Sequence, residues 1–211
     1  MRKLMQTVAV LLTSLFLAAA QAATFEEGKQ YERLSSVQPT SAPDKIEVVE
    51  LFWYGCPHCY RLEPHIEQWL ESKPGDVEFV RLPAVLSPRW ELLARAWYTA
   101  ELLGVTGQIH KPLFQAIHDK RKRINTVEEL KAFFVEQGVT AEDFDKTFHS
   151  FGVAAKLNRA REMTQRYRVR GVPALIINGK YRTSASEAGS HAAMIEVTNH
   201  LIEKERAAAG D

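Results

Sequence analysis

The stretch ELFWYGCPHCYRLEP, residues 50–64, contains both cysteines of the 211-residue chain, Cys56 and Cys59. Only a proline and a histidine separate the two thiols. A chain of this length buries enough apolar surface to fold without disulfide staples. A disulfide between residues so close in sequence would also close a very small loop, which stabilises a protein little. The pair therefore favours a chemical role over a structural one.

The residues on either side of this stretch predict a strand, a helix and a second strand. Apolar, β-branched and aromatic residues fill positions 45–54, as in a buried strand. Apolar residues then recur at helical spacing from Pro57 to a Pro-Gly pair that ends the helix, and a proline suits the first helical turn. The alternating segment 77–83 predicts the second strand. Such a unit places its two strands parallel, with a right-handed crossover.

A long helical segment follows, from residue 87 to about residue 167. Ser87 is expected to cap its first helix, and Thr126 and Glu129 have the spacing of a capping box. Strand signals then return over residues 172–183, where an Asn-Gly pair between two short runs predicts a β-hairpin.

An amphipathic helix is expected from about residue 190 to residue 206. This order of elements, with no low-complexity linker, predicts an α/β fold that carries an inserted all-helical domain. The expected divisions are residues 1–22 as a signal peptide, 23–86 as the first part of the α/β domain, 87–162 as the inserted helical domain, and 163–211 as the second part of the α/β domain.

The first 22 residues have the pattern of a secretory signal peptide, with two basic residues, a short apolar run and a small-residue cleavage site that ends at Ala22. The alternative is a membrane anchor, which needs about 20 apolar residues and so a longer run than this one. Removing residues 1–22 leaves 25 Lys and Arg against 26 Asp and Glu, and this balance gives no reason to expect a nucleic-acid partner. The basic run at 118–123 is interpreted as a solvated helix end.

The thiol pair lies where the first strand meets the first helix. At a helix N-terminus, unpaired N–H groups and the helix dipole favour a thiolate at Cys56, whereas Cys59 is expected to be more buried. His58 adds a hydrogen-bond donor or a positive charge. Whatever stabilises the reduced thiolate form also makes the corresponding disulfide a stronger oxidant.

A structural disulfide and a zinc site are the alternatives to a redox-active dithiol. A structural disulfide is disfavoured by the small loop. A zinc site needs four ligands, and the chain has no second cysteine pair, so no metal is predicted. The other histidines share no metal-ligand spacing and are interpreted as surface or packing residues: His65, His110, His118, His149, His191 and His200.

The motifs FWYGCPHCY and RGVPALIINGKY, with the helical segment between them, resemble the DsbA family of periplasmic thiol–disulfide oxidases, which have a thioredoxin-like fold. The resemblance implies that Cys56 attacks and Cys59 resolves, within a CPHC motif that also contains Pro57 and His58. It implies that Val172-Pro173 is a cis-proline loop opposite the dithiol, where unpaired backbone groups can pair with an extended substrate.

The same resemblance implies a monomeric periplasmic enzyme that passes its disulfide to newly exported, cysteine-containing proteins. A quinone-linked inner-membrane protein of the DsbB type would reoxidise it, and no cofactor is expected besides the redox-active disulfide. Two other functions stay open at this point. One is a disulfide isomerase or reductase, and the other is a peptide-binding module without redox chemistry.

Glu50 shares strand parity with Val48 and Phe52, so a buried strand would direct its carboxylate toward apolar neighbours. Burial raises the pKa of a carboxylate and makes it a candidate proton acceptor, whereas an acid at a solvated strand end would be ordinary. The residues alone do not favour either the buried proton acceptor or the ordinary solvated acid at Glu50. The resemblance implies an acid beneath the dithiol, which can take the proton from Cys59.

Overall fold

The computed structural model describes residues 25–209, so the signal peptide predicted for residues 1–22 lies outside the described part of the chain. Its centre is a five-stranded sheet in the order β1-β5-β4-β2-β3, in which β2 and β3 are parallel and the other neighbours are antiparallel. The strands are β1 (Glu32–Arg33), β2 (Ile46–Phe52), β3 (Val77–Pro83), β4 (Ala174–Ile177) and β5 (Tyr181–Ser184).

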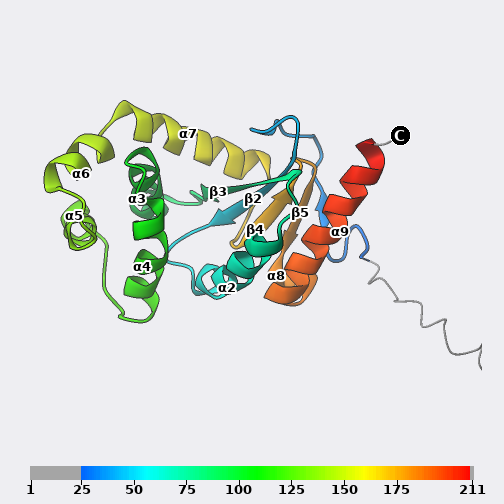
Figure 1. Ribbon diagram of the computed structural model, residues 1–211, viewed down its shortest axis with the longest axis horizontal. Helices are drawn as coiled ribbons and strands as arrows, with labels where there is room; N and C mark the ends of the chain where they lie inside the picture. Colours follow the sequence, from blue (N-terminus) through cyan, green and yellow to red (C-terminus); the bar gives the residue numbers. More distant parts are fainter. Residues whose placement is uncertain (1–24, 210–211) are drawn as a thin grey trace, which may run out of the picture.

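Helices cover both faces of this sheet and form a group of their own at one end (Figure 1). They are α2 (Pro57–Ser72), the short 3-10 helix η1 (Pro88–Trp90), α3 (Glu91–Leu102), α4 (Thr106–His118), α5 (Val127–Glu136), α6 (Ala141–Phe148), α7 (Phe151–Arg166), α8 (Ala185–Ala188) and α9 (His191–Ala209). In Figure 1, helices α3 to α6 gather beside the sheet, and α7 runs from this group back along it.

Alternation of side chains along β2 explains the layers. Val48 packs in one buried cluster with side chains of α2 and α9, whereas Val49 and Leu51 pack in another with Met163 of α7. Because successive strand residues point to opposite faces, a strand with apolar residues at both parities is covered on both sides. The apolar run predicted as a buried strand therefore places the end of β2, and the start of α2, between the two helical layers.

The helical group forms between β3 and β4, as the pattern over 87–167 predicts. The capping box is confirmed: the Thr126 hydroxyl accepts from the Glu129 N–H, and the Glu129 carboxylate accepts from the Thr126 N–H. Ser87 is the N-cap residue of the first turn, as predicted, but its side chain makes no capping hydrogen bond. The segment opens with a 3-10 turn in which the Ser87 carbonyl accepts from the Trp90 N–H at 3.0 Å.

The predicted hairpin is confirmed as β4 and β5, with Asn178 and Gly179 both at positive φ in the turn. The last helix begins at His191 and ends at Ala209, about three residues beyond the expected end. Among the described residues, none of the helices combines the length and apolarity that crossing a membrane requires.

Candidate redox site

The two cysteines occupy the junction between β2 and α2. Cys56 is the N-cap residue of α2, and Pro57 is the first helical residue. The Cys56 N–H donates to the Trp53 carbonyl at 2.9 Å, and the Cys56 carbonyl accepts from the Tyr60 N–H at 3.2 Å. Both thiols are free; Cys56 is partly exposed and Cys59 is fully buried. Reagents and substrates can therefore reach one thiol and not the other.

The surroundings move the pKa values of the two thiols in opposite directions. Several hydrogen bonds lower the pKa of Cys56 to about 6, and the largest comes from the Cys59 thiol. Burial acts against this shift, and the N–H groups of Cys59 and His58 and the charge of His58 support it. The pKa of Cys59 is raised well above its ordinary value, chiefly by burial. Cys56 is therefore a thiolate near neutral pH while Cys59 stays protonated.

His58 has a smaller part in this than its place between the cysteines suggests. The side chain is exposed, and its Nδ1 accepts from the Arg61 guanidinium at 2.9 Å. His58 contributes its backbone N–H and its charge, and both rank behind the Cys59 thiol as causes of the lowered pKa of Cys56.

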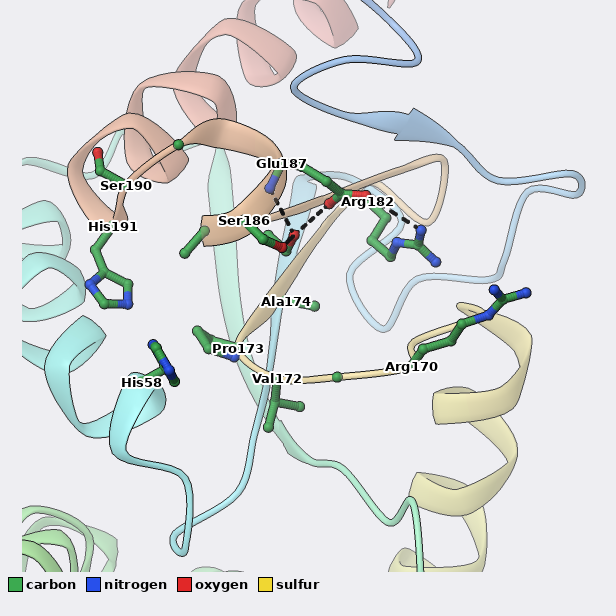
Figure 2. Close-up of a pocket in the computed structure, with 14 residues that line it drawn as sticks. His58, Arg170, Val172, Pro173, Ala174, Arg182, Ser186, Glu187, Ser190 and His191 are labelled. Carbon is green, nitrogen blue, oxygen red and sulfur yellow. Dashed lines mark hydrogen bonds and ion pairs between the residues drawn. The ribbon is translucent and has the colours of Figure 1, made fainter.

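A loop from the second half of the chain faces Cys56. The Val172-Pro173 peptide bond is cis, as the resemblance implies, and the Cys56 thiol lies 3.4 Å from the Val172 carbonyl oxygen. A cavity of about 640 Å³ opens beside this loop, and Figure 2 shows His58, Pro173 and His191 along one side of it. The partly exposed thiol thus lies next to a backbone segment that also lines the cavity.

Stacked indoles support the loop that precedes Cys56. The rings of Trp53 and Trp90 are parallel to within 4°, with their centroids 4.4 Å apart. A Cβ atom at Gly55 would lie 2.4 Å from the Trp53 ring. Only glycine allows the backbone to pass this close to the stacked rings.

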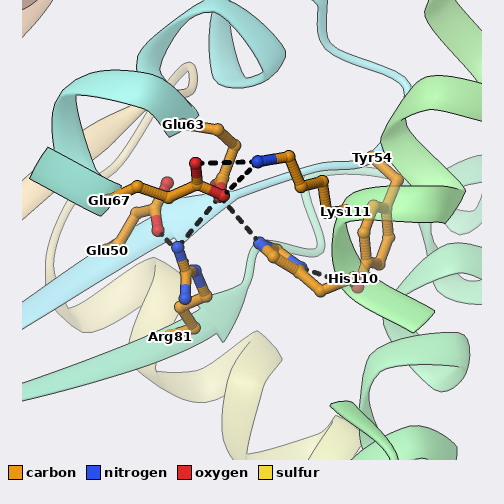
Figure 3. Close-up of polar contacts among 7 residues, drawn as sticks. All are labelled: Glu50, Tyr54, Glu63, Glu67, Arg81, His110 and Lys111. Atoms are coloured by element: carbon orange, nitrogen blue, oxygen red, sulfur yellow. Dashed lines mark hydrogen bonds and ion pairs between the residues drawn. The ribbon is translucent and has the colours of Figure 1, made fainter. Parts of the chain in front are cut away.

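A buried charged cluster lies on the same face of the sheet as α2. Glu50 is fully buried, and its carboxylate binds the Arg81 guanidinium at 3.0 Å. The same guanidinium binds Glu63 at 2.9 Å (Figure 3). Burial raises the pKa of Glu50 to about 7; the charge of Glu63 raises it further, and Arg81 opposes the shift. Glu50 also raises the pKa of Cys59, so its charge acts on the buried thiol.

Sequence reasoning missed three members of this cluster: Glu63, Arg81 and His110. Arg81 is the direct register partner of Glu50, and Glu63 lies one helical turn after Cys59 on the buried side of α2. An arginine within the largely apolar strand 77–83 was the available signal. His110, interpreted as a surface or packing residue, is buried, and its Nδ1 lies 2.9 Å from the Tyr54 hydroxyl.

Within residues 25–209, no group of three or more His, Cys, Asp or Glu side chains is arranged to bind a metal ion. The groups that the site brings together are two unlike thiols, a facing backbone loop and a buried carboxylate.

Comparisons with known proteins agree with this geometry. The model of the family described as "DSBA-like thioredoxin domain" matches residues 81–193, more than half of the chain. The thiol:disulfide interchange protein DsbA of Pseudomonas aeruginosa (strain PAO1) is 45% identical over 209 residues, which cover 99% of each chain. The chain belongs to the DsbA family.

Solved structures extend the agreement to three dimensions. The crystal structure of Pseudomonas aeruginosa DsbA is similar with a TM-score of 0.85 and 44% identity, covering 89% of this chain and 97% of that one. Proteus mirabilis DsbA, solved with a non-covalently bound peptide PWATCDS, is similar with a TM-score of 0.72 and 30% identity, covering 86% of this chain and 100% of that one. The fold is therefore the thioredoxin-like fold of DsbA proteins with its helical insertion, and the chain is a thiol:disulfide oxidoreductase.

Proposed function

We propose that this DsbA-family protein is a periplasmic disulfide oxidase that donates a Cys56–Cys59 disulfide to newly exported proteins. The observation that carries the proposal is the contrast between the two thiols. Cys56 is partly exposed and its pKa is lowered to about 6, whereas Cys59 is buried and its pKa is raised. A low pKa at Cys56 makes it a good leaving group, so the disulfide is readily transferred.

Oxidation of a substrate takes two exchange steps. A substrate thiolate attacks the Cys56 sulfur, the Cys56–Cys59 bond breaks, and Cys59 leaves as a thiolate that takes up a proton. A second substrate thiolate then attacks the substrate sulfur of the mixed disulfide, and Cys56 leaves as a stable thiolate. The substrate loses two electrons and gains a disulfide, and the enzyme gains two thiols.

In reoxidation the electrons flow the other way, and Cys56 is the attacking thiolate. The Cys56 thiolate attacks a disulfide of the oxidant, and Cys59 must then lose its proton before it attacks the Cys56 sulfur. Glu50 is the proposed partner for this proton, because it is buried on the α2 face, acts electrostatically on Cys59 and has a pKa of about 7. A group that titrates near the working pH both donates and accepts a proton readily.

The loop at Val172 and Pro173 is the proposed platform for the substrate. A relative, Proteus mirabilis DsbA, was solved with the cysteine-containing peptide PWATCDS bound non-covalently. In this chain the Val172 carbonyl faces Cys56, so an extended segment that pairs with this backbone would bring its own sulfur to the Cys56 sulfur.

We further propose that the protein acts as a monomer and that a quinone-linked inner-membrane protein of the DsbB type reoxidises it. The support is membership of the DsbA family together with the signal-peptide pattern in the sequence. The redox-active disulfide is the only cofactor proposed.

The test is the oxidation of reduced, unfolded ribonuclease A by the oxidised protein. Each enzyme molecule should consume two substrate thiols, with a second-order rate that Cys56→Ser abolishes. Cys59→Ser has no disulfide to donate, but its Cys56 thiolate should attack a disulfide of scrambled, oxidised ribonuclease A, release one substrate thiolate and accumulate a mixed disulfide, visible by mass spectrometry. A protein that binds the substrate without loss of thiols would be a binding module, and the proposal would fail.

A further inference from the structure

The cavity of about 640 Å³ beside the Val172-Pro173 loop has two ends of different chemistry. His58 and His191 lie at one end, which is also the end next to the partly exposed thiol. Figure 2 shows Arg170 and Arg182 at the other end, with both side chains extending away from the histidines. A peptide segment that follows the loop away from the thiol therefore approaches the arginines.

The charge of Arg182 is taken up within the protein. Its guanidinium forms ion pairs with Glu32 and Glu187 and donates to the Arg168 carbonyl. Among the described residues that line the cavity, Glu187 is the only acid, and its carboxylate also accepts from the Ser184 hydroxyl at 2.7 Å. Arg182 and Glu187 are thus occupied with each other and with their neighbours, and neither offers its charge to a ligand.

Arg170 differs from Arg182 in having no such partner. Its side chain is exposed, and within residues 25–209 no carboxylate lies at ion-pair distance from it. In Figure 2 no dashed line joins it to any of the residues drawn. A guanidinium is always charged, and its planar fork of N–H donors matches the geometry of a carboxylate. Arg170 is therefore the arginine of this cavity whose charge is open to a ligand.

The position of Arg170 in the loop sets where along a substrate its charge acts. The Val172 carbonyl oxygen lies 3.4 Å from the Cys56 sulfur, so a substrate cysteine that reacts there must lie beside Val172. Arg170 comes two residues earlier in the chain, which is at most about 7 Å of backbone. An extended substrate advances about 3.3 Å per residue, and the arginine side chain has a reach of its own. Its guanidinium can therefore meet a substrate side chain about two to four residues from the cysteine.

We propose that this cavity selects cysteines that have an aspartate or glutamate about two to four residues away, and that Arg170 binds the carboxylate of that residue. The inference rests on the proposed function, because it names the class of substrate that the oxidase prefers. The overall charge gives no such preference, since 25 basic and 26 acidic residues remain when residues 1–22 are removed. Arg170 acts on the approach and alignment of the substrate, not on the exchange of sulfurs itself.

The expected size of the preference follows from the exposure of Arg170. Ion pairs at the solvated rim of an interface change association rates by small factors, and salt screens them. We therefore expect a preference of about threefold for an acid over its amide at low salt. The preference should disappear at about 1 M salt, where the Debye length is only about 3 Å.

The experiment measures how fast the reduced protein reacts with short peptides whose single cysteine is joined to 2-thiopyridine by a disulfide. The Cys56 thiolate attacks the peptide sulfur, the bond to the pyridine sulfur breaks, and pyridine-2-thione leaves and is followed by its absorbance. The peptides carry Asp, Asn or Lys in the middle of the proposed range, either before or after the cysteine, and are otherwise identical. The rate of each peptide with free glutathione corrects for its intrinsic reactivity.

The parent protein should react about threefold faster with the Asp peptide than with the Asn peptide, and most slowly with the Lys peptide, on at least one side of the cysteine. These rates should converge at about 1 M salt. Arg170→Gln should bring the Asp and Asn rates to within about 1.5-fold of each other at low salt. Arg170→Glu should reverse the order of the Asp and Lys peptides.

Arg168→Gln is the matched control. Arg168 is also exposed and, within the described part of the chain, has no carboxylate at ion-pair distance, but it does not line the cavity. Its substitution changes the net charge by the same amount as Arg170→Gln and should keep the parent preference. The neutral Asn peptide should react with every variant at about the parent rate, within about twofold, because the Cys56 thiolate is unchanged.

Equal corrected rates for the Asp, Asn and Lys peptides in the parent protein would overturn the inference. A preference that survives Arg170→Gln, or that Arg168→Gln abolishes equally, would overturn it as well. A parent protein that releases no pyridine-2-thione even from the neutral peptide would instead overturn the proposed function.

Discussion

Cys56 and Cys59 lie three positions apart in the sequence, yet their surroundings shift the pKa values of the two thiols in opposite directions. Cys56 is the N-cap residue of α2, and its sulfur accepts a hydrogen bond from the Cys59 thiol, so the pKa of Cys56 falls to about 6. Cys59 is buried in an aromatic cluster, so its pKa rises. The division into an attacking and a resolving thiol follows from burial and hydrogen bonding at single residues.

The ranking of these causes predicts how variants titrate. Cys59→Ala removes the donor to the Cys56 sulfur, so it should raise the midpoint of the Cys56 titration by about one pH unit, as expected for a charge-assisted hydrogen bond. Cys59→Ser keeps a donor and should stay near the parent. His58→Leu should have a smaller effect than Cys59→Ala. Thiolate absorbance at 240 nm measures all three, and a larger effect of His58→Leu would show that the ranking is wrong.

Sequence patterns predicted the exposure or burial of some residues of the site and not of others. The exposed position of Cys56 and the burial of Cys59 follow from their places at the start and one turn into the helix. The sequence could not predict whether the Glu50 side chain is buried, because the end of a strand with this pattern can lie in the core or at the solvated surface. His110 packs among aromatic rings, as the packing interpretation allows. Its polar partners Tyr54 and Glu63 could not be predicted, because they lie about 50 residues away along the chain and no local pattern connects them.

At the scale of elements, the site depends on how β2 passes into α2. The Trp53 ring lies beneath Gly55 and stacks on Trp90 from the short 3-10 helix. This packing fixes the backbone just before Cys56. Strand β3 has the predicted bounds, whereas the helix after Ser87 starts with a 3-10 turn, which a cap rule based on side chains does not detect.

This packing predicts a specific effect for Gly55→Ala. The added methyl group must displace the Trp53 indole, so we expect a loss of about 1 to 3 kcal/mol in the free energy of unfolding and a changed Cys56 titration. Thr126→Ala, which removes the capping box of α5, is the matched control. It should cost about 1 kcal/mol and leave the Cys56 titration unchanged. Gly55→Ala with parent-like stability and titration would mean that the stacked rings do not hold the loop.

At the scale of the molecule, the helical insertion completes the site. It supplies Trp90 and His110, while the second half of the thioredoxin-like fold supplies Val172 and Pro173. The fold class and the order of elements could be predicted because periodicity and turn signals are local. The buried polar cluster could not, because three distant segments create it only when they pack together.

Ionisation of Cys56 links the redox state to stability. Its pKa is about 6 in the folded reduced protein and about 8.5 in an unfolded chain. This depressed pKa stabilises the folded reduced form above pH 8.5, and the stabilisation is lost as the pH falls through 6. The oxidised form has no thiol to ionise, and Cys59 opposes the effect only above about pH 8.5, because its pKa is raised.

The stability of the reduced form relative to the oxidised form should therefore rise by about 1 to 2 kcal/mol between pH 5 and pH 8, after allowance for the partial exposure of Cys56. Urea denaturation of both forms across this range measures the difference. Glu50 is present in both forms, so its own titration largely cancels. A difference that does not vary with pH would contradict the assignment of the thiolate to Cys56.

The equilibrium between the Cys56–Cys59 pair and glutathione at pH 7 tests the central claim most directly. Because the reduced form is stabilised by the Cys56 thiolate, the disulfide should be a stronger oxidant than glutathione, whose cytosolic poise lies near about −220 to −260 mV. Half-reduction at a potential clearly above this range is the predicted result. Half-reduction near about −270 mV, where thioredoxin lies, would make the protein a reductase and contradict the account.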